Sequence, residues 1–197
     1  MPAAHFKHFT PILFFAAVLA AQHVPDLKAT ASWLDKNDLS KNWNRPGRPI
    51  PHAPRGAELD DFCRAKRYHA QTPEESFIEK AGWILMGKST AVNGISIVGA
   101  QAFNDGMCRP TQYQEFVFVR GQYAGTLSPA LMDAREDGAF SRIASLDGGH
   151  IAAEFVRYTE KDPRCCPSRI SQVEYEIRGE SGKPLVAVKS VKTGSAE

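Results

Sequence analysis

The sequence predicts an α+β fold: a mostly antiparallel β-sheet with one N-terminal helix packed on it, stapled by disulfides. Three observations support this. A strong helix start near Thr72 precedes several short segments rich in β-branched and aromatic residues. Glycine and Asn-Asp-Gly turns separate those segments, and short connections favour antiparallel neighbours. Four cysteines lie in a chain with a predicted export signal, and an exported protein can form disulfides.

The predicted export signal occupies residues 1–21. A weakly basic start precedes the apolar run 11–21, which ends in small alanines suited to cleavage. A membrane-spanning helix needs about 20 apolar residues, and polar residues from Gln22 onward interrupt this run. No cysteine follows it closely, so a lipid anchor is not expected. We therefore predict an extracytoplasmic protein, periplasmic or secreted, with no transmembrane segment after signal cleavage.

Residues 22–58 are predicted to form a flexible, proline-rich basic linker. The stretch 41–55 has no apolar periodicity, which is typical of an extended, solvated spacer. Its cationic side chains are Lys41, Arg45, Arg48 and Arg55. An alternative interpretation is that these charges contact an anionic surface such as phospholipid or cell-wall polymer.

The remaining residues, 59–197, are predicted to form a single domain. Removal of the signal leaves about 175 residues, enough for one domain with a real core and a tail. Thr72 is suited to be the N-cap of its helix, with Pro73 at the first helical position and Glu75 closing a capping box. Gly82 can end this helix. Its predicted apolar stripe is Phe77, Ile78 and Ala81.

Seven later segments are predicted to be strands because of their residue types and the turns between them. They are residues 83–86, 95–98, 114–119, 123–127, 151–158, 171–177 and 185–191. Residues 172–177 alternate strictly between polar and apolar types, so one face of that strand should be solvated and the other buried.

The tripeptide Cys165-Cys166-Pro167 governs the interpretation of the four cysteines. Adjacent cysteines are poorly placed to pair, because a disulfide normally separates its two Cα atoms by about 5–6 Å. Of the three possible connectivities, we expect those in which Cys63 and Cys108 each bond one member of the adjacent pair. The alternative is a redox or soft-metal site, although no Cys-x-x-Cys occurs and no histidine adjoins a cysteine.

One segment matches the phosphate-binding P-loop pattern letter for letter, from Gly82 to Ser89. Its setting contradicts that function, because a helix precedes it, bulky apolar residues fill the loop, and residues 92–98 are typical of a turn and strand. We interpret it as a buried strand ending in a Gly-Lys-Ser turn.

No motif assigns a reaction. The sequence has no His-Glu-x-x-His and no Gly-x-Ser-x-Gly, so it predicts no catalytic residue, cofactor or metal site. His69 and His150 are the remaining candidates for a general base. The charge balance, 24 basic against 22 acidic residues, gives no broad field for nucleic acid, which we do not expect as a partner.

Several segments resemble the LppP/LprE family of bacterial exported proteins over roughly residues 75–180. They are residues 106–111, 116–119, 125–129, 135–138, 155–158 and 162–169. The element Asp162-Pro-Arg-Cys-Cys-Pro-Ser168 is the most specific of them. Named members are typically lipoproteins, and this chain departs from them by lacking a lipidation cysteine. The resemblance implies an extracytoplasmic bacterial domain without an assigned enzymatic activity.

A candidate ligand site follows from the arginines that flank the cysteines: Arg109, Arg164 and Arg169. If the disulfides converge, these guanidinium groups would gather at one loop and grip a carboxylate or phosphate, with Tyr113 as nearby surface. The alternative is that each arginine faces solvent or pairs with a local acid such as Asp105.

The preferred function is a non-enzymatic domain that binds an envelope ligand or a protein partner. The alternative is an unrecognised envelope enzyme or a thiol- or metal-dependent redox protein.

Overall fold

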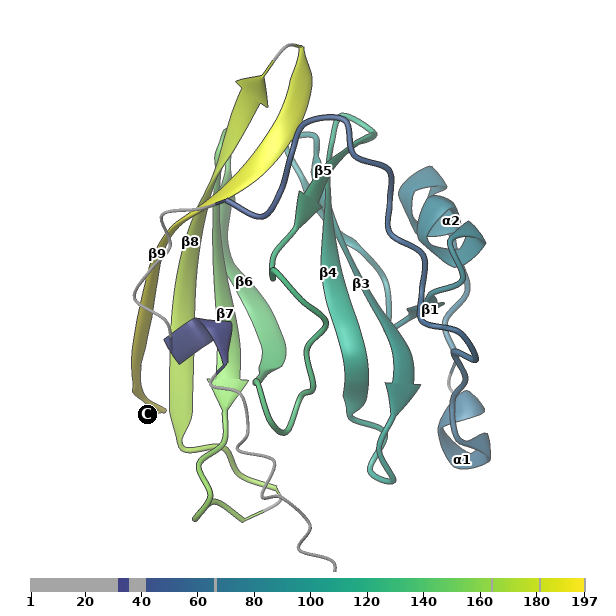
Figure 1. The fold of residues 1–197 in the computed structure, drawn as a ribbon, viewed down its shortest axis with the longest axis vertical. Helices are drawn as coiled ribbons and strands as arrows, with labels where there is room; N and C mark the ends of the chain where they lie inside the picture. Colours follow the sequence, from purple (N-terminus) through teal and green to yellow (C-terminus); the bar gives the residue numbers. More distant parts are fainter. Residues whose placement is uncertain (1–31, 36–41, 66, 164, 181, 197) are drawn as a thin grey trace, which may run out of the picture.

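The computed structural model describes residues 32–35, 42–65, 67–163, 165–180 and 182–196. The predicted signal peptide, residues 1–21, lies outside the described residues. Two antiparallel β-sheets pack face to face, and two short helices lie beside the first sheet (Figure 1). The predicted fold class, mostly antiparallel β with an N-terminal helix, is confirmed.

The first sheet has five strands and the second has four. In the first, the order is β1-β3-β4-β5, and β2 also pairs with β3. Its strands are β1 (Ile84–Leu85), β2 (Thr90–Val92), β3 (Ile95–Asn104), β4 (Pro110–Val119) and β5 (Gln122–Thr126). The second sheet has the order β6-β7-β8-β9. Its strands are β6 (Ala139–Asp147), β7 (His150–Arg157), β8 (Arg169–Glu180) and β9 (Lys183–Ser195).

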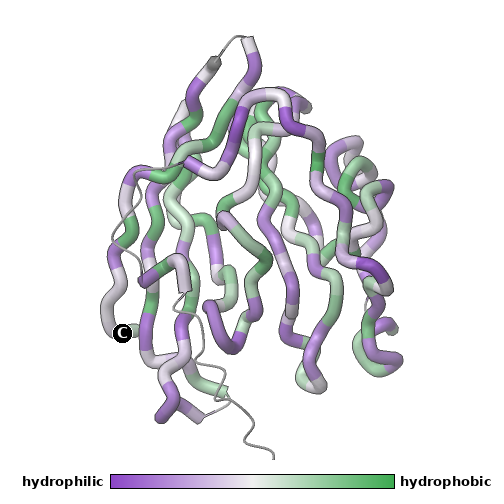
Figure 2. The backbone as a smooth tube through the Cα atoms, viewed as in Figure 1, coloured by the Kyte–Doolittle hydropathy of each residue, from purple (hydrophilic) through white to green (hydrophobic). Residues whose placement is uncertain are grey.

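The main core lies between the two sheets. The predicted alternation on β8 is confirmed, because Val173 and Tyr175 are buried while Gln172 and Glu174 are exposed. Hydrophobic and hydrophilic residues alternate in this way along the strands (Figure 2). The core side chains include Ile97, Tyr113, Val117, Ile151, Phe155, Val173 and Tyr175. A second core on the outer face of the first sheet contains Ile78, Trp83, Val98, Phe116 and Phe118.

Helix α2 (Pro73–Lys80) covers this second core and begins as predicted. Thr72 is its N-cap, and the capping box with Glu75 is present. Ile78 and Ala81 are buried, but Phe77 is 45% exposed, so the predicted apolar stripe is wrong at Phe77. A shorter helix, α1 (Asp61–Arg64), precedes it, and a 3₁₀ turn, η1 (Trp33–Asp35), lies near the start of the described chain.

Glu75 explains why the Gly82–Ser89 segment is not a P-loop. Its buried carboxylate accepts the backbone N–H groups of Gln71 (2.7 Å), Thr72 (3.1 Å) and Ser89 (2.8 Å). Burial alone would raise the pKa of Glu75, but these hydrogen bonds outweigh it and lower the pKa. The backbone N–H of Ser89 is therefore bound to a carboxylate and not free to bind a phosphate, and the segment is followed by strand β2 and not by a helix.

Two strands were not among those predicted, β2 and β6. Strand β6 lies at the edge of the second sheet, and its register against β7 shifts twice, between Phe140 and Arg142 and between Ile143 and Ser145. Each shift reverses the inside–outside alternation. The sequence of β6 consequently has no regular period of two.

The predicted cysteine pairing is wrong. Cys63 bonds Cys108, with 5.6 Å between their Cα atoms, and Cys165 bonds its neighbour Cys166. The cause is the docking of the chain before α1 on the end of β3. The N–H of Glu58 donates to the carbonyl of Ala102 (2.9 Å), and the N–H of Asp60 donates to Oδ1 of Asn104 (3.0 Å) at the end of β3. These contacts bring Cys63 to the turn between β3 and β4, where Cys108 lies.

Candidate functional site

The structure describes three of the four sequence-predicted site residues and places them in separate local roles. Arg109 is bound to Asp105, with Nε 2.6 Å from Oδ2, as the alternative interpretation expected. Arg169 has Asp35 as its acidic partner at 3.9 Å. Tyr113 is fully buried, and its hydroxyl donates to the carbonyl of Gly138 (2.5 Å). Arg164 lies outside the described residues.

The described residues of the neighbouring loop, 158–163 and 165–168, contact other segments that carry the family resemblance. Two guanidinium groups lie near the ring of Tyr158, with Cζ of Arg135 4.2 Å and Cζ of Arg109 5.9 Å from the ring centroid. Arg135 also donates to the backbone carbonyls of Asp162 (3.1 Å) and Pro163 (3.4 Å). Sequence reasoning missed Arg135, although it lies in one of the segments used for the resemblance.

Asp162 hydrogen-bonds to both ends of this loop. Its carboxylate accepts the N–H of Thr159 (2.7 Å) and both the N–H (3.0 Å) and the hydroxyl (2.9 Å) of Ser168. The hydrogen bond from Thr159 is the main reason why the pKa of Asp162 is lowered to about 2. The Asp and Ser of the Asp-Pro-x-Cys-Cys-Pro-Ser element therefore hold the two ends of the loop together.

Both histidine candidates lie at the surface of the protein. His69 is exposed, with Nδ1 3.5 Å from a carboxylate oxygen of Glu79. His150 is also exposed and is the first residue of β7, paired across the turn with Asp147.

Residues 42–58, here called the arm, form a different kind of site. The arm is extended and crosses the upper ends of both sheets before it descends beside the first sheet (Figure 1). The carbonyl of Thr126 on β5 accepts from the indole of Trp43 (3.0 Å) and the side-chain amide of Asn44 (2.9 Å). The same Asn44 amide donates to Val186 on β9 (3.1 Å), so the arm bridges the two sheets.

This packing differs from the solvated spacer predicted for these residues. Asn42, Trp43, Asn44 and Glu58 of the arm hydrogen-bond to the backbone of distant strands, and such contacts leave no periodic pattern in the sequence of the arm. The side chain of Asn44 packs directly on Gly125, where φ is +130° and an added Cβ would lie 2.3 Å from Cγ of Asn44. Because only a residue without a side chain leaves room here, Gly125 provides the seat for Asn44.

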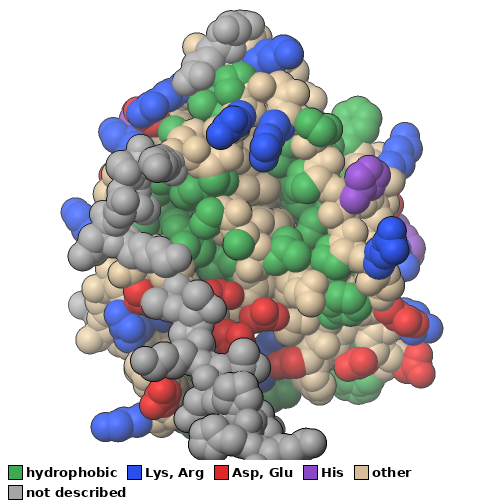
Figure 3. Space-filling view, in the orientation of Figure 1, with side chains coloured by type: hydrophobic (Ala, Val, Ile, Leu, Met, Phe, Trp, Pro, Cys, Tyr) green, Lys and Arg blue, Asp and Glu red, His purple; other side chains and the backbone are tan. Residues whose placement is uncertain are grey.

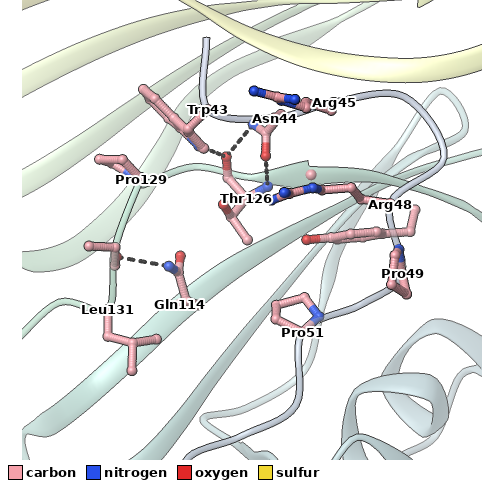
Figure 4. Close-up of a pocket in the computed structure, with 13 residues that line it drawn as sticks. Trp43, Asn44, Arg45, Arg48, Pro49, Pro51, Gln114, Thr126, Pro129 and Leu131 are labelled. Carbon is pink, nitrogen blue, oxygen red and sulfur yellow. Dashed lines mark hydrogen bonds between the residues drawn. The ribbon is translucent and has the colours of Figure 1, made fainter. Parts of the chain in front are cut away.

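A cavity of about 300 Å³ lies between the arm and the outer side of β5 (Figure 4). Its wall is mixed. The larger apolar and aromatic residues in it are Trp43, Pro49, Pro51, Tyr123, Pro129 and Leu131, and the uncharged polar ones are Asn44, Gln114 and Thr126. The amide groups in the wall already have partners. Gln114, for example, donates to Ala130 (2.8 Å) and accepts from Ser128 (2.7 Å). The charged groups in the wall are Arg45 and Arg48.

These two arginines are presented by one tight turn, Arg45-Pro46-Gly47-Arg48, here called the arginine turn. Pro46 suits the second position of such a turn, and Gly47 adopts the left-handed φ of +68° required at the third. The first and fourth residues of a β-turn have Cα atoms less than about 7 Å apart. Both guanidinium groups extend from the arm towards Trp43 and Thr126 (Figure 4).

A third cation packs on the arginine turn. The side chain of Lys183 lies against Gly47, where an added Cβ would be 2.6 Å from Nζ. None of Arg45, Arg48 and Lys183 forms an ion pair with another residue in the described part of the chain. Arg48 lies close enough to Tyr123 to oppose the rise in the pKa of that hydroxyl that burial causes. Figure 3 shows Lys and Arg side chains over the upper part of this face and most Asp and Glu side chains over its lower part.

The family model described as LppP/LprE lipoprotein matches residues 93–180. Over this segment, which is less than half of the chain, the protein is similar to the LppP/LprE lipoprotein family. The resemblance predicted from the sequence is thereby confirmed. No curated protein and no solved structure matches the chain. Among the described residues, no helix is long and apolar enough to cross a membrane, and no cluster of His, Cys, Asp or Glu could hold a metal ion.

The LppP/LprE segment contains the receptor of the arm but not the arm itself. Gly125 and Thr126 seat Asn44, and Ser128 fixes Gln114 in the cavity wall. The arm and Lys183 lie on either side of the matched segment in the sequence. The site is thus assembled from family residues and from flanking residues that supply its positive charge.

Proposed function

We propose that this protein is an exported, non-enzymatic binding domain of the cell envelope whose cavity beneath the arm takes an anionic amphiphile. The main observation behind this proposal is the arginine turn. It places two guanidinium groups, without an ionic partner among the described residues, in the wall of a cavity that is also lined by aromatic and apolar side chains. Arginine binds carboxylate and phosphate oxygens in a two-pronged geometry. The apolar and aromatic part of the wall would take the uncharged part of the same ligand.

The composition of the cavity favours binding over catalysis. Its lining contains no His, Cys, Asp or Glu, the residue types that most often act as general acid, general base or nucleophile. Arginine stays protonated at all ordinary pH values and cannot relay a proton. Export is supported by the match to a family of exported lipoproteins.

The test is titration with three probes: hexyl phosphate, hexyl glucoside and inorganic phosphate. Binding is followed by the NMR signal of the Trp43 indole N–H, which donates to Thr126 inside the site. We expect hexyl phosphate to bind at least about tenfold more tightly than either other probe, because only it has both the charge and the apolar chain.

Matched variants decide whether the arginine turn is responsible. Arg45→Ala and Arg48→Ala should each weaken hexyl phosphate binding about tenfold or more, and Arg48→Lys should recover part of the loss. Arg55→Ala is the control, because Arg55 is an exposed cation of the same arm that does not line the cavity. Equal binding of hexyl phosphate and hexyl glucoside, or equal losses in the Arg55 and Arg48 variants, would contradict the proposal.

A further inference from the structure

We propose that the Cys165–Cys166 disulfide is a redox-active pair that exchanges with dithiols, and that Cys63–Cys108 is the structural disulfide. The two bonds differ first in accessibility. Cys165 and Cys166 are both exposed, whereas Cys63 is 7% exposed. Thiol–disulfide exchange requires a thiolate to reach a sulfur atom, so access separates reactive disulfides from inert ones.

The bonds differ also in what they can stabilise. A disulfide stabilises a fold chiefly by restricting the unfolded chain, and the effect grows with the length of the closed loop. Cys63 and Cys108 are separated by 45 positions in the sequence, and Cys165 and Cys166 by one. The adjacent pair closes no loop of the chain and crosslinks no two segments. Its contribution to stability by this mechanism is negligible.

The loop that carries the pair keeps its shape through contacts independent of the sulfur atoms. Asp162 ties Thr159 to Ser168, and Arg135 holds the carbonyls at the start of the loop. The N–H of Cys166 donates to the carbonyl of Pro163 (3.1 Å), the same carbonyl that accepts from Arg135 (3.4 Å). These contacts do not require the disulfide, so the oxidised and reduced forms can share one loop conformation.

The same contacts hold the guanidinium of Arg135 near the backbone of the pair. The guanidinium of Arg135 is linked to the backbone of Cys166 through a single carbonyl, that of Pro163. A nearby cation stabilises a thiolate relative to a thiol. It therefore stabilises the thiolate that leaves when the disulfide is attacked.

One thiolate of an external dithiol attacks Sγ of one cysteine, the Cys165–Cys166 bond breaks, and a mixed disulfide forms while the other cysteine leaves as thiolate. The second thiol of the dithiol then attacks its own bound sulfur and releases the first cysteine. The external dithiol is oxidised to a disulfide, and two electrons and two protons pass to the cysteine pair.

The test uses the full chain purified without reductant and treated with increasing dithiothreitol. Free thiols are trapped with N-ethylmaleimide and located by peptide mass mapping. We expect both adjacent cysteines to be labelled at least about tenfold faster than Cys63 and Cys108, with an unchanged far-ultraviolet circular dichroism spectrum. Oxidised glutathione should restore the bond.

Two outcomes would overturn the proposal. The first is reduction of the two disulfides at the same rate. The second is labelling of Cys165 and Cys166 before any reductant is added, which would mean that the pair is not oxidised. A Cys165→Ser/Cys166→Ser variant controls for background labelling. Arg135→Gln should slow reduction of the pair severalfold while leaving that of Cys63–Cys108 unchanged, and an equal effect on both would remove the role given to Arg135.

Discussion

Glu115 makes the stability of this protein depend on pH in an unusual direction. It lies on β4 between Tyr113 and Val117, on the face turned towards the second sheet, and is 3% exposed. Its Oε1 has no hydrogen-bond partner among the described residues. Loss of solvation disfavours the charged carboxylate and raises the pKa of Glu115 from 4.5 to about 8. The folded protein therefore holds this side chain protonated and neutral at pH 6.

The sign and size of the effect follow from proton binding. Between pH 4.5 and about 8 the folded chain keeps a proton on Glu115 that the unfolded chain has lost. Unfolding releases that proton, so the free energy of unfolding falls as the pH rises, by at most about 1.4 kcal/mol per pH unit. Over this window the loss is on the order of 4 kcal/mol, and below pH 4.5 Glu115 contributes no pH dependence.

The perturbation is Glu115→Gln, which is neutral in both states. Urea unfolding at half-unit steps from pH 5 to 8 should show a falling free energy of unfolding for the natural chain and a flatter profile for the variant. The other titratable groups are common to both proteins, so their contributions cancel in the difference between the two profiles. Parallel profiles would refute the argument. A uniform offset is no contradiction, because the buried amide has its own hydrogen-bonding cost of about 1–3 kcal/mol.

Three further predictions concern other parts of the fold. Replacing Cys63 and Cys108 by serine should lower the free energy of unfolding by about 4 kcal/mol, the chain-entropy value for a loop of this length, and serine at the adjacent pair should change it little; urea unfolding compares them. Glu75→Gln should cost on the order of 2–3 kcal/mol near neutral pH. Folding lowers the pKa of Glu75, so the charged carboxylate stabilises the folded state at pH values above the pKa of the unfolded chain. The difference in free energy of unfolding between the natural protein and the Glu75→Gln variant should therefore narrow as the pH falls through the pKa of the folded state. Gly125→Ala should expel Asn44 from its seat and expose the arm to limited proteolysis, whereas alanine at the open Gly148 should not.

Local signals in the sequence were sufficient for the capped helix and for most strands. The capping box of α2 depends on residues three positions apart, and the alternation on β8 reflects one solvated and one buried face. Both patterns involve residues close together in the sequence, so they can be recognised without knowledge of the fold. The edge strand β6 was not predicted, because its two register shifts interrupt the alternation of buried and exposed residues.

The candidate site was harder to predict because it depends on contacts between distant segments. Cys63 meets Cys108 only because the chain before α1 docks on the β3 end, and no local pattern shows that docking. The positive charges of the predicted linker are visible in the sequence, but the cavity that two of them line is not. Arg45 and Arg48 line a cavity because Asn44 packs on Gly125, and about 80 residues separate these two in the sequence.

The arm also ties the arginine turn to the relative position of the two sheets. Asn44 hydrogen-bonds β5 of one sheet and β9 of the other, and Lys183, the first residue of β9, packs on Gly47 of the turn. A shift of one sheet against the other would therefore separate Lys183 from the two arginines. Because three like charges in one place repel each other, an anion bound among them would offset that repulsion and favour the arrangement in which the arm bridges both sheets. Ligand binding and the docking of the arm should thus stabilise each other.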